Sequence, residues 1–220
     1  MIRSLLRWAL YLMLAFYGFC TLSLLYLKFY APICTTVHLQ HQIESFFKPG
    51  GYTRRYTFVP LGRISDHLEH AAIAAEDGRF FQHHGIDWLE LQKAIEDNWK
   101  RGWLWRGGST ITQQLVKNLF LTTHQSVLRK ALEMPLTPLA ELIVSKERIL
   151  ELYLNVIEWG PGVYGAEAAA QYYYNIPAAR LGREQAARLA ACIPAPRSCK
   201  PQQLDRYSAI ILNRMSRMGW

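Results

Sequence analysis

Residues 71–88 read AAIAAEDGRFFQHHGIDW, and this stretch joins a helix-forming pattern to a cluster of chemically reactive side chains. Alanine is the strongest helix former, so the first residues predict the end of a helix. Two adjacent acids, Glu76 and Asp77, close that helix and are followed by Phe80, His83 and Gly85. A helix built only for packing does not need two carboxylates at its end.

The two acids admit two interpretations. Adjacent residues on a helix point about 100° apart, so only one of them can be the primary acid or base. Burial at the end of an apolar helix raises a carboxyl pKa toward neutrality. This suits Glu76 as a general base, with Asp77 orienting a neighbour or accepting a hydrogen bond. On spacing alone, two solvated acids at a helix end are the better interpretation.

His83 and His84 offer nitrogen ligands for a metal ion. However, the sequence lacks the H-x-x-x-H pair with a glutamate that is typical of a zinc site. We therefore expect the histidines to have a structural or hydrogen-bonding role.

The rest of the chain continues the helical pattern. Apolar residues at spacings of three and four indicate helices, and Ser65 or Asp66 and Ser145 are suited to cap two of them. Almost no strand signal occurs apart from a short extended piece in RRYTFVPL. The fold class is therefore mainly α, with short helices around one core. The predicted helices cover the alanine run from residue 66, then 87–100, 110–120, 126–133, 145–155, 166–174, 184–192 and 204–215.

The composition indicates a folded chain and an anionic partner. Half of the 220 residues are hydrophobic, which excludes a disordered chain, and the net charge is +8. A basic chain suits an anionic partner: nucleic acid, an anionic membrane surface or a phosphorylated substrate.

The N-terminal segment indicates a membrane anchor. Residues 8–27 carry no charge, and they are long enough for the roughly 20 residues that cross a bilayer core. A cleavable signal peptide is the alternative, but no clear small-x-small cleavage site follows. Arg3 and Arg7 precede the segment, so residues 1–7 are predicted to be cytoplasmic and the domain to lie outside. This topology disfavours nucleic acid. Residues 28–44 are predicted to be a stalk.

Two further clusters carry polar chemistry. In GGSTITQQLVKN, residues 107–118, glycines permit a tight turn and Ser109 or Thr110 can cap a helix that bears Lys117. Such a helix start suits a phosphate or a sugar, although a solvated helix face is the alternative. In RKALE, residues 129–133, Glu133 is either a simple helical ion-pair partner or a second functional carboxylate among cations.

Taken together and in this order, the motifs closely resemble those of the peptidoglycan glycosyltransferases of family 51, and best the monofunctional biosynthetic transglycosylases. The resemblance covers roughly residues 45–218, predicted as the glycosyltransferase domain. The matching motifs are EDGRFFQHHG (76–85), GGSTITQQLVKN (107–118), RKALE (129–133), KERILELYLN (146–155) and GPGVYGAEAAAQYYY (160–174).

The resemblance implies a lysozyme-like helical domain on the outer (periplasmic) face of the bacterial cytoplasmic membrane, held by one transmembrane helix. It implies polymerisation of lipid II into glycan strands with inversion, and release of undecaprenyl pyrophosphate. Glu76 matches the catalytic base, and Glu133 matches a second essential glutamate near the departing pyrophosphate. The expected substrate-binding residues are Asp77, Phe80, His83, Ser109, Thr110, Gln113, Gln114, Lys117, Asn118, Arg129, Lys130, Arg148, Glu151 and Asn155.

Family habit and the pyrophosphate suggest a divalent cation, Mg or Mn, but no set of metal ligands is readable. The expected partners are lipid II, the growing glycan strand and the membrane, with other cell-wall synthesis or division proteins as candidates. In NWKRGWLWRGG, residues 98–108, tryptophans alternate with cations, which suits a bilayer interface. A surface loop whose tryptophans pack on the core is an equal alternative.

Two departures from the family pattern concern the site. Pro135 and Pro138 follow Glu133, and because proline lacks a backbone donor we expect a helix to end or restart there and to displace Glu133. The usual lysine is replaced near Ile176. The alternative functions are a lysozyme-like glycan hydrolase and a catalytically inactive glycan-binding scaffold.

Cys192 and Cys199 flank IPAPRS and could pair in an oxidising compartment. We expect instead that Cys192 is a buried apolar residue and Cys199 an unpaired loop thiol.

Overall fold

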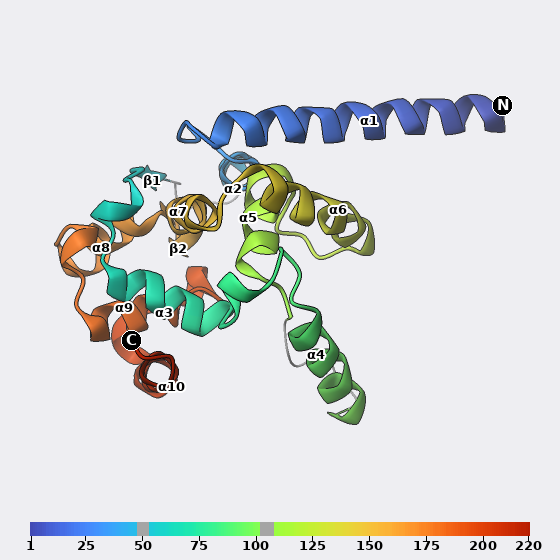
Figure 1. Cartoon of the computed structure of the whole chain (residues 1–220). Coiled ribbons are helices and arrows are strands. Elements are labelled where there is room, and N and C mark those ends of the chain that lie inside the picture. Colours follow the sequence, from blue (N-terminus) through green and yellow to red (C-terminus); the bar gives the residue numbers. More distant parts are fainter. Residues whose placement is uncertain (48–52, 102–107) are drawn as a thin grey trace.

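The computed structural model describes residues 1–47, 53–101 and 108–220, and it is built almost entirely of helices (Figure 1). Serine or threonine begins several of them: the side chains of Ser65, Thr110, Ser126 and Ser145 each accept a hydrogen bond from a backbone N–H of the first turn. This confirms the mainly α prediction. The α-helices are α1 (Ile2–Leu27), α2 (Thr36–Phe46), α3 (Asp66–Glu76), α4 (Trp88–Arg101), α5 (Ile111–Phe120), α6 (Val127–Ile143), α7 (Lys146–Val156), α8 (Ala166–Tyr174), α9 (Arg183–Ala190) and α10 (Asp205–Arg217).

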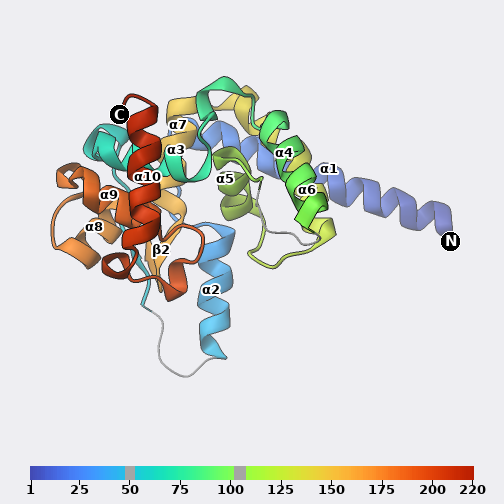
Figure 2. The same ribbon diagram turned by 90° about the horizontal axis from the view of Figure 1, so that it is seen from below.

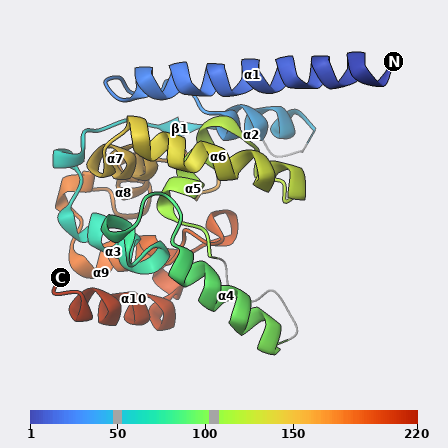
Figure 3. The same cartoon turned by 45° about the vertical axis from the view of Figure 1, so that its right-hand side comes forward.

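Helix α5 lies in the middle of the domain and packs against both α6 and α7. At one end of the molecule, α3 packs against α9, and α10 lies across both (Figure 2). Alanines on the facing sides of α3 and α9, among them Ala72 and Ala187, are fully buried and allow the two helices to approach closely. Helix α4 projects from the body on the side opposite α1 (Figures 1 and 3).

A small sheet joins distant parts of the chain. Its strands are β1 (Arg55–Tyr56), β2 (Glu158–Gly160) and β3 (Val163–Tyr164), in the order β1-β3-β2. β1 runs parallel to β3, with Arg55 opposite Val163, and β2 is antiparallel to β3. The predicted extended piece before α3 is thereby held against the segment that follows α7.

The segments before β1 are in contact with the domain. Helix α2 begins within residues 28–44, predicted as a stalk, and ends two residues beyond them; it packs against α5 and buries His38 and His41. Helix α1 runs alongside α6 (Figure 3) and buries Cys20 and Leu24. The sequence analysis did not predict these contacts, because they depend on side chains far apart in the chain.

The expected break at Pro135 and Pro138 is wrong, because α6 continues through both prolines. Both side chains lie on the exposed side of the helix, where carbonyls that lose their intrahelical partner can meet solvent. The opposite side is held in place by Leu136 and Ala140, which are fully buried. Packing on that side preserves the helix, and Glu133 stays within it.

The expectation of unpaired cysteines is also wrong. Cys192 and Cys199 form a disulfide, with Cα atoms 5.4 Å apart. The chain turns back after α9 through the short 3-10 helix Pro196–Ser198, and this turn brings the two residues together. Sequence spacing alone does not reveal such a turn.

Candidate active site

Glu76 and Asp77 separate because the helix ends between them. Glu76 is the last residue of α3, and Asp77 leaves the helix with φ −155° and ψ 70°. The Gln114 amide on α5 donates a hydrogen bond of 2.6 Å to Glu76 Oε2. Glu76 Oε1 accepts no hydrogen bond from any residue of the described chain. Glu76 is therefore held in place through Oε2, and Oε1 is left without a hydrogen-bond donor from the described residues.

Asp77 ties the end of α3 to the start of α5. His83 Nε2 lies 2.9 Å and 3.0 Å from the two oxygens of Asp77, and the backbone N–H of Ile111 donates to Asp77 Oδ2 at 3.0 Å. A carboxylate at a helix N-terminus is favoured by the helix dipole. The expected hydrogen-bonding role of His83 is thus present in the structure, whereas His84 is exposed.

The loop between Asp77 and α5 is fixed from both sides. Thr110 caps α5 in a reciprocal capping box with Gln113, and its hydroxyl also donates to the carbonyl of Gly85 at 2.5 Å. Gly85 has φ +90°, and a Cβ there would lie 2.8 Å from Cγ2 of Thr137. Glycine is required at this position because both the backbone conformation and the close approach exclude a side chain.

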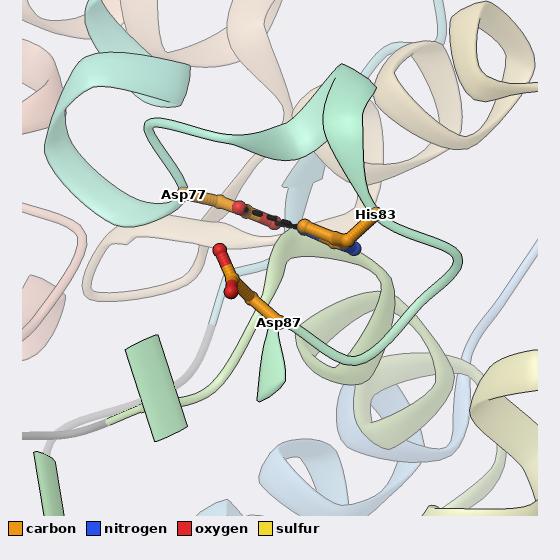
Figure 4. Close-up of side chains that lie close together, drawn as sticks. All are labelled: Asp77, His83 and Asp87. Carbon is orange, nitrogen blue, oxygen red and sulfur yellow. Dashed lines mark hydrogen bonds and ion pairs between the residues drawn. The ribbon is translucent and has the colours of Figure 1, made fainter. Parts of the chain in front are cut away.

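Asp87, which the sequence analysis did not single out, lies beneath the Asp77–His83 pair with its carboxylate directed at Asp77 (Figure 4). One ligand atom from each of the three residues lies within 4.8 Å of the others, which is a spacing that a metal ion could bridge. However, His83 Nε2 and both Asp77 oxygens are engaged with each other. Asp87 Oδ1 caps α4, and Arg79 Nε lies 3.6 Å from Asp87 Oδ2. The cluster fits a hydrogen-bonded support better than an open coordination site.

Glu133 lies on α6 in a strongly positive setting. It is only 2% exposed, and its two oxygens separately accept hydrogen bonds of 2.5 Å from Arg129 and Lys130. Lys130 also donates to the hydroxyl of Ser109 at 3.2 Å, which links α6 to the start of α5. A buried carboxylate is tolerated here because it is paired on both oxygens.

The pKa of Lys117 is influenced by the charges of both glutamates. Burial lowers the pKa of its ammonium group, while the charges of Glu133 and Glu76 both act to raise it. Burial also raises the pKa of Glu76 above its ordinary value. The Gln114 hydrogen bond and the positive charges of Lys117 and Arg214 oppose this rise. Glu76 thus has the partly desolvated environment predicted for a general base.

Two cavities meet at Gln114 and Pro194. One, of about 720 Å³, contains Glu76 together with Ser109 and Thr110. The other, of about 510 Å³, contains Lys117 and Asn118. Two adjoining cavities of this size suit a reaction that joins two large substrates.

The structure does not bring all predicted site residues into these cavities. Arg148 and Glu151 pair with each other on α7; Arg148 also donates to the carbonyl of Leu27, at the end of α1. Asn155 exchanges two hydrogen bonds of 2.9 Å with the backbone of Val59. Their contacts are structural, joining α7 to the end of α1 and to the segment before α3.

Two other predicted residues support the site from outside it. Phe80 is fully buried, with the Lys146 ammonium 4.3 Å from its ring centroid. Gln113 acts as the capping partner of Thr110.

The sequence analysis missed residues that come from the C-terminal helix. Tyr207, Arg214 and Arg217 on α10 line the cavity of Glu76. Arg214 donates to the carbonyls of Ala74 and Ala75 at the end of α3. Only their amphipathic spacing was visible in the sequence, and that pattern is typical of any surface helix. Trp103 and Trp105 of the predicted interfacial loop lie outside the described residues.

Glu133, Arg129 and Lys130 line neither cavity, although Lys130 bonds Ser109 at the edge of the Glu76 cavity. The fold is that of a helical, lysozyme-like transferase domain, and the model of the Transglycosylase family matches residues 40–216. The chain belongs to this family.

Three similar proteins carry the name biosynthetic peptidoglycan transglycosylase. The protein of Dechloromonas aromatica (strain RCB) is 57% identical over 162 residues, covering 72% of this chain and 70% of that protein. The protein of Janthinobacterium sp. (strain Marseille) is 47% identical over 187 residues, covering 83% and 81%. The protein of Azoarcus sp. (strain BH72) is 50% identical over 166 residues, covering 76% and 72%.

Proposed function

We propose that this chain is a peptidoglycan glycosyltransferase of cell-wall synthesis, which polymerises lipid II and releases undecaprenyl pyrophosphate with inversion. The observation that carries this proposal is the presence of two unlike glutamates whose charges both act on Lys117. Glu76 is partly desolvated and presents a free oxygen, whereas Glu133 is surrounded by cations. Transfer of a glycosyl group from a pyrophosphate-linked sugar requires a base for the acceptor hydroxyl and positive charge for the leaving pyrophosphate.

In this proposal Glu76 acts as the base. Its free Oε1 would take the proton from the 4-hydroxyl of the acceptor sugar as that oxygen attacks the anomeric carbon of the donor. The bond from that carbon to the pyrophosphate oxygen breaks, and the electron pair leaves with undecaprenyl pyrophosphate. Because attack and departure occur on opposite faces, the configuration inverts.

The leaving group would meet the cations of α5 and α6. Lys117 lines the second cavity, and Arg129 and Lys130 stand beside Glu133. We propose that Glu133 holds these two side chains in position and that they share their positive charge with the pyrophosphate. We also propose that a divalent cation, Mg or Mn, accompanies the pyrophosphate beside Glu133. Both Glu133 oxygens are already engaged, so the ligands of such a cation would come chiefly from the phosphate oxygens.

We also propose that α1 is a single-pass anchor in the bacterial cytoplasmic membrane, with the catalytic domain on the periplasmic side. α1 is long and apolar enough to span a membrane, with a mean hydropathy of 1.8 over an 18-residue window. Contacts with the domain begin near Phe16. The part of α1 that precedes Phe16 would span only about 21 Å at 1.5 Å per residue, which is less than the ~30 Å thickness of a bilayer core.

The part of α1 that packs on α6 would therefore also lie at membrane depth. The exposed apolar side chains of α6, Val127, Leu128 and Leu142, suit contact with lipid there.

The decisive experiment incubates the detergent-purified full chain with lipid II and separates polymer from undecaprenyl pyrophosphate. Glu76→Gln should lower the rate of polymer formation at least about 100-fold, the usual contribution of a general base. Glu69→Gln is a matched control, since Glu69 lies on the same helix outside both cavities. Cleavage of finished glycan without polymerisation would overturn the proposal in favour of a hydrolase, and near-normal activity of Glu76→Gln would overturn the assignment of the base.

A further inference from the structure

Tyr153 reaches Glu76 through one intermediate side chain. Tyr153 lies on α7 and is fully buried, and its hydroxyl donates a hydrogen bond of 3.2 Å to Gln114 Oε1. The other end of the same amide, Gln114 Nε2, donates to Glu76 Oε2 at 2.6 Å. The three side chains come from α7, α5 and α3, so the relay exists only in the folded domain.

The orientation of the Gln114 amide between Tyr153 and Glu76 follows from which of these groups can donate a hydrogen bond and which can accept one. An ionised carboxylate only accepts hydrogen bonds, so Glu76 requires the NH₂ end of the amide. The carbonyl end of Gln114 then faces Tyr153 and requires a donor. Burial, together with the negative charges of Glu76 and Asp77, raises the pKa of Tyr153 well above its ordinary value, so the phenol keeps its proton.

We propose that Tyr153 is a positioning residue for the transfer reaction, whose hydroxyl fixes the Gln114 amide so that it holds Glu76 by Oε2 and leaves Oε1 to the acceptor sugar. The inference rests on the proposed function. The fixed amide also favours the ionised form of Glu76, in opposition to burial. Loss of the hydroxyl leaves the amide free to rotate and to turn its carbonyl toward the carboxylate.

The test is Tyr153→Phe, which keeps the ring in the core and removes only the hydroxyl. We expect kcat for lipid II polymerisation to fall about two- to tenfold, the value of one neutral hydrogen bond. The acid limb of the pH–rate profile should move to higher pH. Tyr173→Phe is a matched control, because among the described residues the Tyr173 hydroxyl donates only to the carbonyl of Trp159, at 3.3 Å, and contacts no member of the Tyr153–Gln114–Glu76 chain.

A double-mutant cycle separates positioning from packing. Gln114→Met keeps the approximate length of the side chain and removes both ends of the relay. In that background Tyr153→Phe should have no further effect on the pH profile, because the hydroxyl acts through the amide. An equal shift in both backgrounds would show that Tyr153 acts through packing and would overturn the inference.

A direct titration makes the test independent of activity. The carboxyl carbon of Glu76, assigned by comparison with Glu76→Gln, can be followed by ¹³C NMR in the isotopically labelled full chain. Tyr153→Phe should raise the pKa of Glu76, and an unchanged pKa would overturn the inference. Failure of the wild-type chain to polymerise lipid II would instead overturn the proposed function, and the titration would still decide the role of Tyr153.

Discussion

Loss of the Cys192–Cys199 disulfide should destabilise the domain by an amount set by the size of the loop. The two cysteines are 7 positions apart, and the chain-entropy relation for that separation gives about 2.4 kcal/mol in the free energy of unfolding. For a chain of this size, that corresponds to a fall in Tm of about 5–10 °C. The loop also carries Arg197, which donates to Glu158 at 3.1 Å, and this contact should partly survive.

The assay is thermal unfolding of the full chain in detergent, followed by circular dichroism. Cys192→Ser/Cys199→Ser should show the lower Tm, and dithiothreitol should lower the Tm of the wild type but not of the double variant. Cys34→Ser, which removes a free thiol, is the control. The reasoning would be refuted by equal Tm values for wild type and double variant, or by titration of all 4 cysteines in unreduced, denatured protein.

Two further predictions concern the backbone and the proton balance of the site. Gly165→Ala should lower the free energy of unfolding by about 3 kcal/mol or more, because Gly165 has φ +87° and a Cβ would lie 2.6 Å from the carbonyl oxygen of Asn155. Gly62→Ala, whose Cβ meets nothing within 4 Å, should be nearly neutral, and equal unfolding curves for both variants would contradict this account. The raised pKa of Glu76 means that polymerisation should rise with pH through a value above that of an ordinary glutamate. The free energy of unfolding should change with pH in the opposite direction to activity. Protonated Glu76 stabilises the fold relative to ionised Glu76, so this stabilisation is fully present below the unfolded-state pKa of Glu76 and is lost as pH rises through its folded-state pKa. Glu76→Gln should therefore be more stable than wild type at neutral pH, with a smaller difference in acid, and a lower Tm at neutral pH would count against it.

Local signals predicted much of the fold. Ser145 caps its helix as expected, and of the two candidates Ser65 and Asp66 it is Ser65 that caps α3; a cap depends only on residues within one turn. Glu76 and Asp77 stand at a helix end, as the alanine run indicated. The family motifs identified Lys117 and Glu133 as further candidates, and in the structure the charge of Glu133 acts to raise the pKa of Lys117.

Long-range contacts account for what the sequence analysis predicted wrongly. α6 continues through Pro135 and Pro138 because its other side is buried, and burial of that side depends on helices distant in the chain. Cys192 and Cys199 pair because the intervening residues turn back after α9. Neither outcome depends on local propensity alone.

The sequence by itself determined the helical class, the apolar N-terminal helix, the helix caps and the chemical types of the two glutamate clusters. These properties follow from side-chain chemistry and from periodicity over a few residues. Only the tertiary structure decided which atoms serve the site. Glu76 presents Oε1 because Gln114 holds Oε2, and Gln114 faces that way because Tyr153, 39 residues further along the chain, bonds its other end. A hydrogen bond depends on the positions of both partners to within a few tenths of an ångström, and the packing of α3, α5 and α7 sets those positions.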